Sequence, residues 1–144
     1  ELAEVEKERA QLEQATADMV VCGEQQPESD HFVEMENSVI GSEQGTPWRE
    51  TRGWFAYKMK SKGKPVNAVR IESFPDAAKD ADVYVNEVKI GSVQGKNALH
   101  TLLLPKELWK ASEWEVKIMR GKSEVTPKFR TVRMVLSRGL LVNE

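Results

Sequence analysis

The stretch PWRETRGWFAYKM, residues 47 to 59, decides the fold class, because its second half alternates between two kinds of side chain. One set of alternate residues is large and apolar: Phe55, Tyr57 and Met59. The other set is mixed: Trp54, Ala56 and Lys58. A period of two is typical of a strand with one buried face. We therefore expect this stretch to enter a β-structured core.

The same period recurs in three later stretches: ADVYVNEVKIG (81–91), WEVKIM (114–119) and TVRMVL (131–136). Gly, Pro, Asn and Lys residues separate them, and no second long amphipathic helix interrupts them. Asn86 and Glu87 are placed to form a type I′ hairpin turn, which needs a positive φ at both residues. Either Glu87 adopts it at a modest cost, which the clean flanking alternation favours, or the loop is wider. The pattern predicts a mainly β protein, an antiparallel jelly-roll-like β-sandwich preceded by one N-terminal α-helix.

That helix is expected over about residues 2 to 18, where strong helix formers occur without Gly or Pro. Its apolar stripe of Leu2, Val5 and Leu12 is thin, so we interpret the helix as a solvated connector. The stretch CGEQQPESD (22–30) is typical of a linker. We therefore divide the chain into residues 1–30, helix and linker, and residues 31–144, the β-sandwich domain.

Composition limits the function. The 144 residues, 40% apolar, suit one domain, and the missing initiator Met suggests a soluble fragment of a longer protein. A net charge of −2 without a clustered basic face argues against a nucleic-acid partner, and no apolar run approaches the roughly 20 residues of a membrane helix. The single cysteine, Cys22, provides neither a disulfide nor a structural zinc site.

Catalytic and metal-binding patterns are weak. Glu34 and Glu36 share one strand face, but solvated acidic residues are commoner than a carboxylate pair with a catalytic role. Neither His31 nor His100 lies in a recognisable nucleophile motif. The sequence therefore predicts no enzyme activity, no cofactor and no metal site. It leaves a calcium site open as the lesser alternative for one loop with three acidic residues: Asp76, Asp80 and Asp82.

Aromatic rings are the remaining candidates, because sugars stack on exposed rings. Large aromatics in a small β-domain are more often core residues, which is our interpretation of Trp48, Trp109 and Trp114. Alternation places Trp54 and Tyr84 opposite the main apolar faces, so these two are the candidate carbohydrate-binding residues. At the start of the strand, Arg49 is expected to be buried and paired with Glu36, with Glu50 as the exposed alternative.

Four stretches together resemble the C-terminal β-sandwich of glycoside hydrolase family 127, β-L-arabinofuranosidase-type enzymes of Bacteroides-like bacteria. They are GEQQPESDHFVEMENSVIG (23–41), PWRETRGWFAYKM, ADVYVNEVKIG and LLLPKELWK (102–110). The chain departs from that family at the 85–87 hairpin and at TPKFRTV (126–132). The resemblance implies an accessory domain of a periplasmic or secreted enzyme whose catalytic barrel lies elsewhere.

Two functions follow as hypotheses. The first is a non-catalytic structural module that packs against the catalytic domain of the parent chain, with an apolar surface. The second is a carbohydrate-binding module that presents arabinose-containing or pectic glycans, with an exposed ring beside hydrogen-bonding groups.

Overall fold

The computed structural model describes residues 2–138. In chain order the elements are α1 (Leu2–Ala15), β1 (Thr16–Val21), α2 (Gln25–Asp30), β2 (Glu34–Glu43), β3 (Thr46–Lys60), β4 (Ala68–Ser73), β5 (Asp80–Val85), β6 (Val88–Gln94), β7 (Leu99–Leu103), the 3-10 turn η1 (Lys106–Leu108), β8 (Glu113–Arg120) and β9 (Phe129–Val135). All strand pairings among them are antiparallel.

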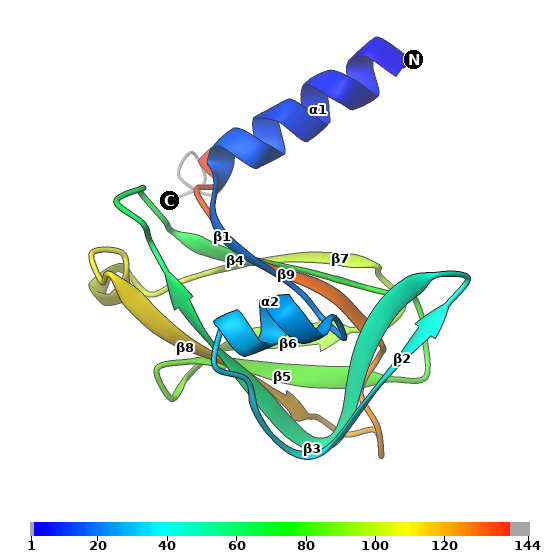
Figure 1. The fold of residues 1–144 in the computed structure, drawn as a ribbon. Helices are drawn as coiled ribbons and strands as arrows, with labels where there is room; N and C mark the ends of the chain where they lie inside the picture. The colour runs from blue at the N-terminus through cyan, green and yellow to red at the C-terminus, as the bar shows by residue number, and fades with distance from the viewer. Residues whose placement is uncertain (1, 139–144) are drawn as a thin grey trace.

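The strands form a sandwich in which β3 joins the two layers (Figure 1). One layer has the order β6-β5-β8-β3, and the other has the order β1-β9-β4-β7. The later part of β3 pairs with β8, whereas Arg49 near its start pairs with Phe129 of β9. Strand β2 pairs with β3 to form a long hairpin. The prediction of an antiparallel jelly-roll-like sandwich after one N-terminal helix is confirmed.

The core lies between these layers and follows the predicted alternation. Each strand contributes alternate side chains, because successive residues point to opposite faces of a sheet. The largest side chains that are fully buried include Phe55, Tyr57, Met59, Ile71, Trp114, Ile118, Phe129 and Met134. Trp109 follows η1 and packs against this core, in keeping with its interpretation as a core residue. Its ring nitrogen donates to the Leu104 carbonyl at 2.8 Å.

The hairpin between β5 and β6 has the predicted two-residue turn. Val85 pairs with Val88, and the φ angles of Asn86 and Glu87 are 49° and 69°. Both values are positive, as a type I′ turn requires. The Asn86 side chain also accepts a hydrogen bond from the backbone N–H of Glu115 at 2.8 Å, which ties the turn to β8.

The N-terminal segment differs from its prediction. The helix ends at Ala15, and residues 16–21 form β1 beside β9, although the predicted helix ran to about residue 18 and the whole of 1–30 was assigned to helix and linker. The predicted linker contains α2, and Cys22 is fully buried in the core. Burial raises the pKa of the Cys22 thiol to about 12, so the thiol stays protonated. Part of the 1–30 segment therefore belongs to the sandwich.

Helix α1 projects from one end of the sandwich (Figure 1). Residues 3–11 of α1 are exposed, and only Leu12 and Ala15 are half-buried. Of the predicted apolar stripe, Val5 is 49% exposed, and the side chain of Leu2 lies outside the described part of the structure. Within residues 2–138, no helix has the length and hydropathy needed to cross a membrane.

Candidate functional site

Arg49 is buried as predicted, but its partner is Glu28. The Arg49 guanidinium donates from Nε to Glu28 Oε2 at 2.7 Å and from Nη2 to Glu28 Oε1 at 2.9 Å. The Tyr57 hydroxyl donates to the same Oε2. The predicted pairing with Glu36 is wrong, because Glu36 lies exposed on the outer side of the β2–β3 hairpin, opposite Trp54.

Burial and hydrogen bonding act in opposite directions on this pair. Burial alone would raise the pKa of Glu28, but the bonds from Arg49 and Tyr57 outweigh it and hold the pKa below its usual value. Burial likewise tends to lower the pKa of Arg49, and Glu28 raises it above its usual value. Both groups are therefore charged, and a bidentate ion pair holds α2 against β3.

A groove opens above this ion pair, between α2 and the β2–β3 hairpin. Its volume is about 540 Å³, and its lining residues are Gln25, Glu28, Ser29, Phe32, Val33, Ile40 and Arg49. Phe32 is 61% exposed and Ile40 is 53% exposed, so two large apolar side chains that line the groove are accessible to solvent. Sequence reasoning missed this groove, because it assigned α2 to a linker.

The two predicted carbohydrate-binding residues lie on one outer sheet face. Tyr84 of β5 and Ala56 of β3 both pair with Lys117 of β8, and Trp54 is two residues from Ala56. Trp54 and Tyr84 are half-buried, and Lys117 Nζ lies 4.6 Å from the centre of the Trp54 ring. The structure therefore brings both rings to the same face, with β8 between their strands and an offset of two residues along β8, from Lys117 to Met119.

Polar side chains continue this face beside the rings. Asp82, two residues before Tyr84, accepts a hydrogen bond from Ser92 Oγ at 2.9 Å and lies 3.4 Å from Lys89 Nζ. Asp82 pairs with Met119, which pairs with Trp54 on the other side. The face thus combines two amphipathic rings with charged and hydroxyl groups, which is a combination that can hold a sugar chain.

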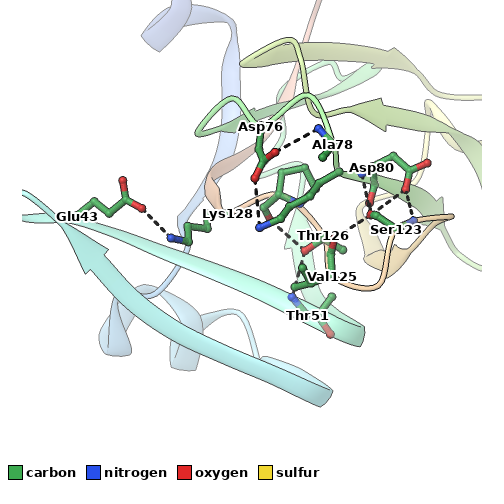
Figure 2. A network of polar contacts seen from close by, with 11 residues as sticks. Glu43, Thr51, Asp76, Ala78, Asp80, Ser123, Val125, Thr126 and Lys128 are labelled. Carbon is green, nitrogen blue, oxygen red and sulfur yellow. Dashed lines mark hydrogen bonds and ion pairs between the residues drawn. The ribbon is translucent and has the colours of Figure 1, made fainter.

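The three aspartates proposed as the lesser alternative for calcium have separate partners. Asp76 lies 3.2 Å from Lys79 Nζ, and Asp80 accepts from the backbone N–H groups of Lys122 and Ser123 (Figure 2). Asp82 faces β6 as described above. Within residues 2–138, no three His, Cys, Asp or Glu side chains are grouped so that they could hold a metal ion. Asp76 and Asp80 instead organise the loops at this end of the sandwich.

Trp48 lies near the start of β3, in the β2–β3 hairpin. Its ring packs over Gly41 of β2, where an added Cβ would lie within 2.3 Å of a ring carbon. Lys128 Nζ lies 4.7 Å from the ring centre and bonds Glu43 at 2.7 Å (Figure 2). This half-buried ring is thus covered by backbone and by a paired lysine, in keeping with its interpretation as a packed residue.

Comparisons with known proteins give a family and a fold. The model of a family of unknown function, DUF6805, matches residues 11–135. No curated protein matches the chain in sequence. The fold is similar to a carbohydrate-binding module of family CBM36 in complex with calcium and xylotriose, with 10% identity, a TM-score of 0.52 and coverage of 73% of this chain and 93% of that one.

Two further solved structures share the fold. One is a family 35 carbohydrate-binding module from an environmental isolate, with 14% identity, a TM-score of 0.51 and coverage of 88% of this chain and 91% of that one. The other is the plant receptor-like kinase ANX2, with 11% identity, a TM-score of 0.56 and coverage of 81% of this chain and 40% of that one. At sequence identities this low, these similarities show a shared fold alone.

Proposed function

The chain belongs to the DUF6805 family, and we propose that it is a non-catalytic glycan-binding β-sandwich domain whose binding surface includes Trp54 and Tyr84. Two solved carbohydrate-binding modules with the same fold support this proposal. The observation that carries it is the placement of both rings on one outer face, with Lys117 between them.

The spacing of this surface suits an extended glycan. Strands β5 and β3 lie on either side of β8, so their backbones are separated by roughly 9–10 Å, which is twice the ordinary strand spacing. A sugar chain lying across β8 would contact Trp54 and Tyr84 with its C–H faces. Its hydroxyls would then meet Lys117 and Asp82, and the flexible Lys117 side chain would move off the Trp54 ring to donate to them.

The test is a calorimetric titration of the chain with neutral and pectic oligosaccharides. We expect Trp54→Ala to lower the affinity at least tenfold, which corresponds to about 1.4 kcal/mol. Phe74→Ala is the matched control, because the Phe74 ring is also half-buried beside a cation, with Arg130 at 5.3 Å. Equal losses in both variants, or no binding by the original chain, would refute the assignment of this surface.

A second candidate is the structural module of a larger glycoside hydrolase. Three exposed apolar side chains on β2 favour it: Met35, Val39 and Ile40. Exposed apolar surface of this kind can mark a contact with another domain. A parent enzyme and a periplasmic or secreted location belong to this proposal, and a preference for arabinose-containing or pectic glycans belongs to the glycan-binding one; all three rest on the family 127 resemblance alone. Co-purification with a separately expressed catalytic domain, lost in Ile40→Asp, would support it.

A further inference from the structure

We propose that the groove between α2 and the β2–β3 hairpin is a second ligand site, which takes a short neutral sugar. It lies away from the outer face of Trp54, because Arg49 and Trp54 are on opposite sides of the hairpin. The proposal rests on the glycan-binding function only for the choice of a sugar as the ligand. The groove volume of about 540 Å³ is within the usual range for a small-molecule site.

The base of the groove carries an unused hydrogen-bond donor. A guanidinium has five N–H groups. Among residues 2–138, four of those of Arg49 have acceptors: two on Glu28, one on Ser38 Oγ at 2.8 Å and one on the Met35 sulfur at 3.1 Å. The thioether sulfur is a weak acceptor. A ligand hydroxyl could therefore accept from the remaining N–H, or replace Met35, without disturbing the ion pair.

The side of the groove presents an aromatic ring at a cost in backbone energy. Phe32 follows α2 with a φ of 52°, a left-handed conformation that a bulky residue adopts rarely because it is sterically strained. The neighbouring backbone holds it there: Phe32 N–H donates to Ser29 at 3.0 Å and Val33 N–H donates to Glu28 at 3.1 Å. The strained residue keeps the ring exposed beside the groove, with Lys58 Nζ 5.6 Å from its centre.

Charge around the groove selects against anions. Two acidic residues of α2 and its N-cap, Glu24 and Asp30, adjoin the lining residues Gln25 and Ser29 in the sequence. Both are exposed, and Lys58, with Nζ 5.6 Å from the Phe32 ring, offsets only part of their negative charge. The cation at the base of the groove, Arg49, is already neutralised by Glu28, which a competing carboxylate would have to displace. A uronic acid would therefore bind poorly.

These properties define the ligand. The apolar lining of Phe32, Val33 and Ile40 suits the C–H face of a ring, and Gln25, Ser29 and Arg49 offer hydrogen bonds to hydroxyls. A neutral sugar has both features and no charge.

The experiment titrates the full chain with neutral xylo- and arabino-oligosaccharides and with galacturonate oligomers, following amide shifts by NMR. We expect neutral sugars to shift residues of α2 and β2, and Phe32→Asn to lower their affinity at this site at least tenfold. Asn tolerates the left-handed conformation, so this variant removes the ring and keeps the backbone. Trp54→Ala should leave the amide shifts of α2 unchanged. A failure of the proposed groove site can therefore be told apart from a failure of the proposed outer-face site.

A charge variant tests the selectivity. Glu24→Gln combined with Asp30→Asn should leave the affinity for neutral sugars unchanged and increase that for galacturonate oligomers about threefold or more, since neither side chain lines the groove and the Glu24 side chain makes no cap hydrogen bond. The proposal is overturned if galacturonate binds the original groove more tightly than neutral sugars do. It is also overturned if no sugar shifts α2, or if Phe32→Asn instead abolishes self-association or the capture of a protein partner.

Discussion

At the scale of single residues, the buried Arg49 makes Glu28 indispensable. Glu28→Gln removes the anion that balances the guanidinium and weakens the acceptor of the Tyr57 hydroxyl. We expect the free energy of unfolding to fall by about 3–5 kcal/mol, as for other broken buried pairs, and Arg49→Ala to have a similar cost. Urea denaturation measures both. Glu36→Gln is the matched control, and a comparable loss there would contradict the assigned pairing.

His31 and Asp18 form a second polar link that depends on pH. His31 Nδ1 lies 2.7 Å from the Pro27 carbonyl and Nε2 lies 2.8 Å from Asp18 Oδ1. Both partners are acceptors, so the imidazolium form satisfies both contacts. The bond to Asp18 raises the pKa of His31 above 6.5. Burial alone would raise the pKa of Asp18, but bonds from His31 and Lys60, with the charge of Lys62, lower it to about 2.

This link predicts a stability maximum on the acid side of neutrality. The raised pKa of His31 contributes fully below pH 6.5, and that contribution is lost as pH rises through the folded-state value. The lowered pKa of Asp18 contributes above pH 3.8, and that contribution is lost as pH falls towards 2. The thermal midpoint should therefore be highest between about pH 4 and 6.5. His31→Gln should flatten the decline above this range, whereas His100→Gln should preserve it.

The partner of Arg49 shows which part of this site the sequence could predict and which part it could not. The need of Arg49 for a buried acid followed from its place among inward-facing aromatics, and that much was predictable. Which acid supplies it was not, because Glu28 is 21 residues away and depends on how α2 folds back on β3. Glu36 was favoured because it lies on the neighbouring strand of the hairpin. In the structure it is level with Trp54, on the side of the hairpin that faces away from Arg49.

At the scale of elements, the strands with clean alternation were predictable and β1 was not. Phe55, Val83 and Trp114 mark strands whose apolar period is visible in the sequence alone. In β1, the residues TADMVV follow a helix without a Gly or Pro break, so local propensity extends the helix. Pairing with β9 overrides it, and Thr16 marks the change by donating from Oγ1 to the Leu12 carbonyl at 2.6 Å.

The hairpin between β5 and β6 yields a prediction for one element. Glu87 has a φ of 69°, where a side chain is unfavourable and Gly is preferred. Glu87→Gly should raise the free energy of unfolding by about 0.5–1 kcal/mol, the reverse of placing a side chain at such a position. Thermal denaturation measures the change. Val88→Gly, at the next residue and within β6, should instead destabilise, and a gain in both variants would contradict the turn assignment.

At the scale of the whole molecule, the sandwich should not depend on most of α1. Residues 3–11 are exposed, and the family model begins only at residue 11. Strand β1, by contrast, is an integral strand whose Val20 is fully buried. The N-terminal region therefore contains two parts with different roles, and the boundary between them lies at Ala15–Thr16 rather than near residue 30.

Removal of residues 1–10 tests this division. We expect the thermal midpoint to change by less than about 2 °C, because residues 3–10 are all exposed and surface changes usually alter stability by under ~0.5 kcal/mol. Val20→Ala in the full chain is the contrasting variant, since removing buried methyl groups costs on the order of 2 kcal/mol and lowers the midpoint by roughly 5–10 °C. A large loss on truncation, together with a small effect of Val20→Ala, would mean that α1 stabilises the domain through contacts made along its exposed face.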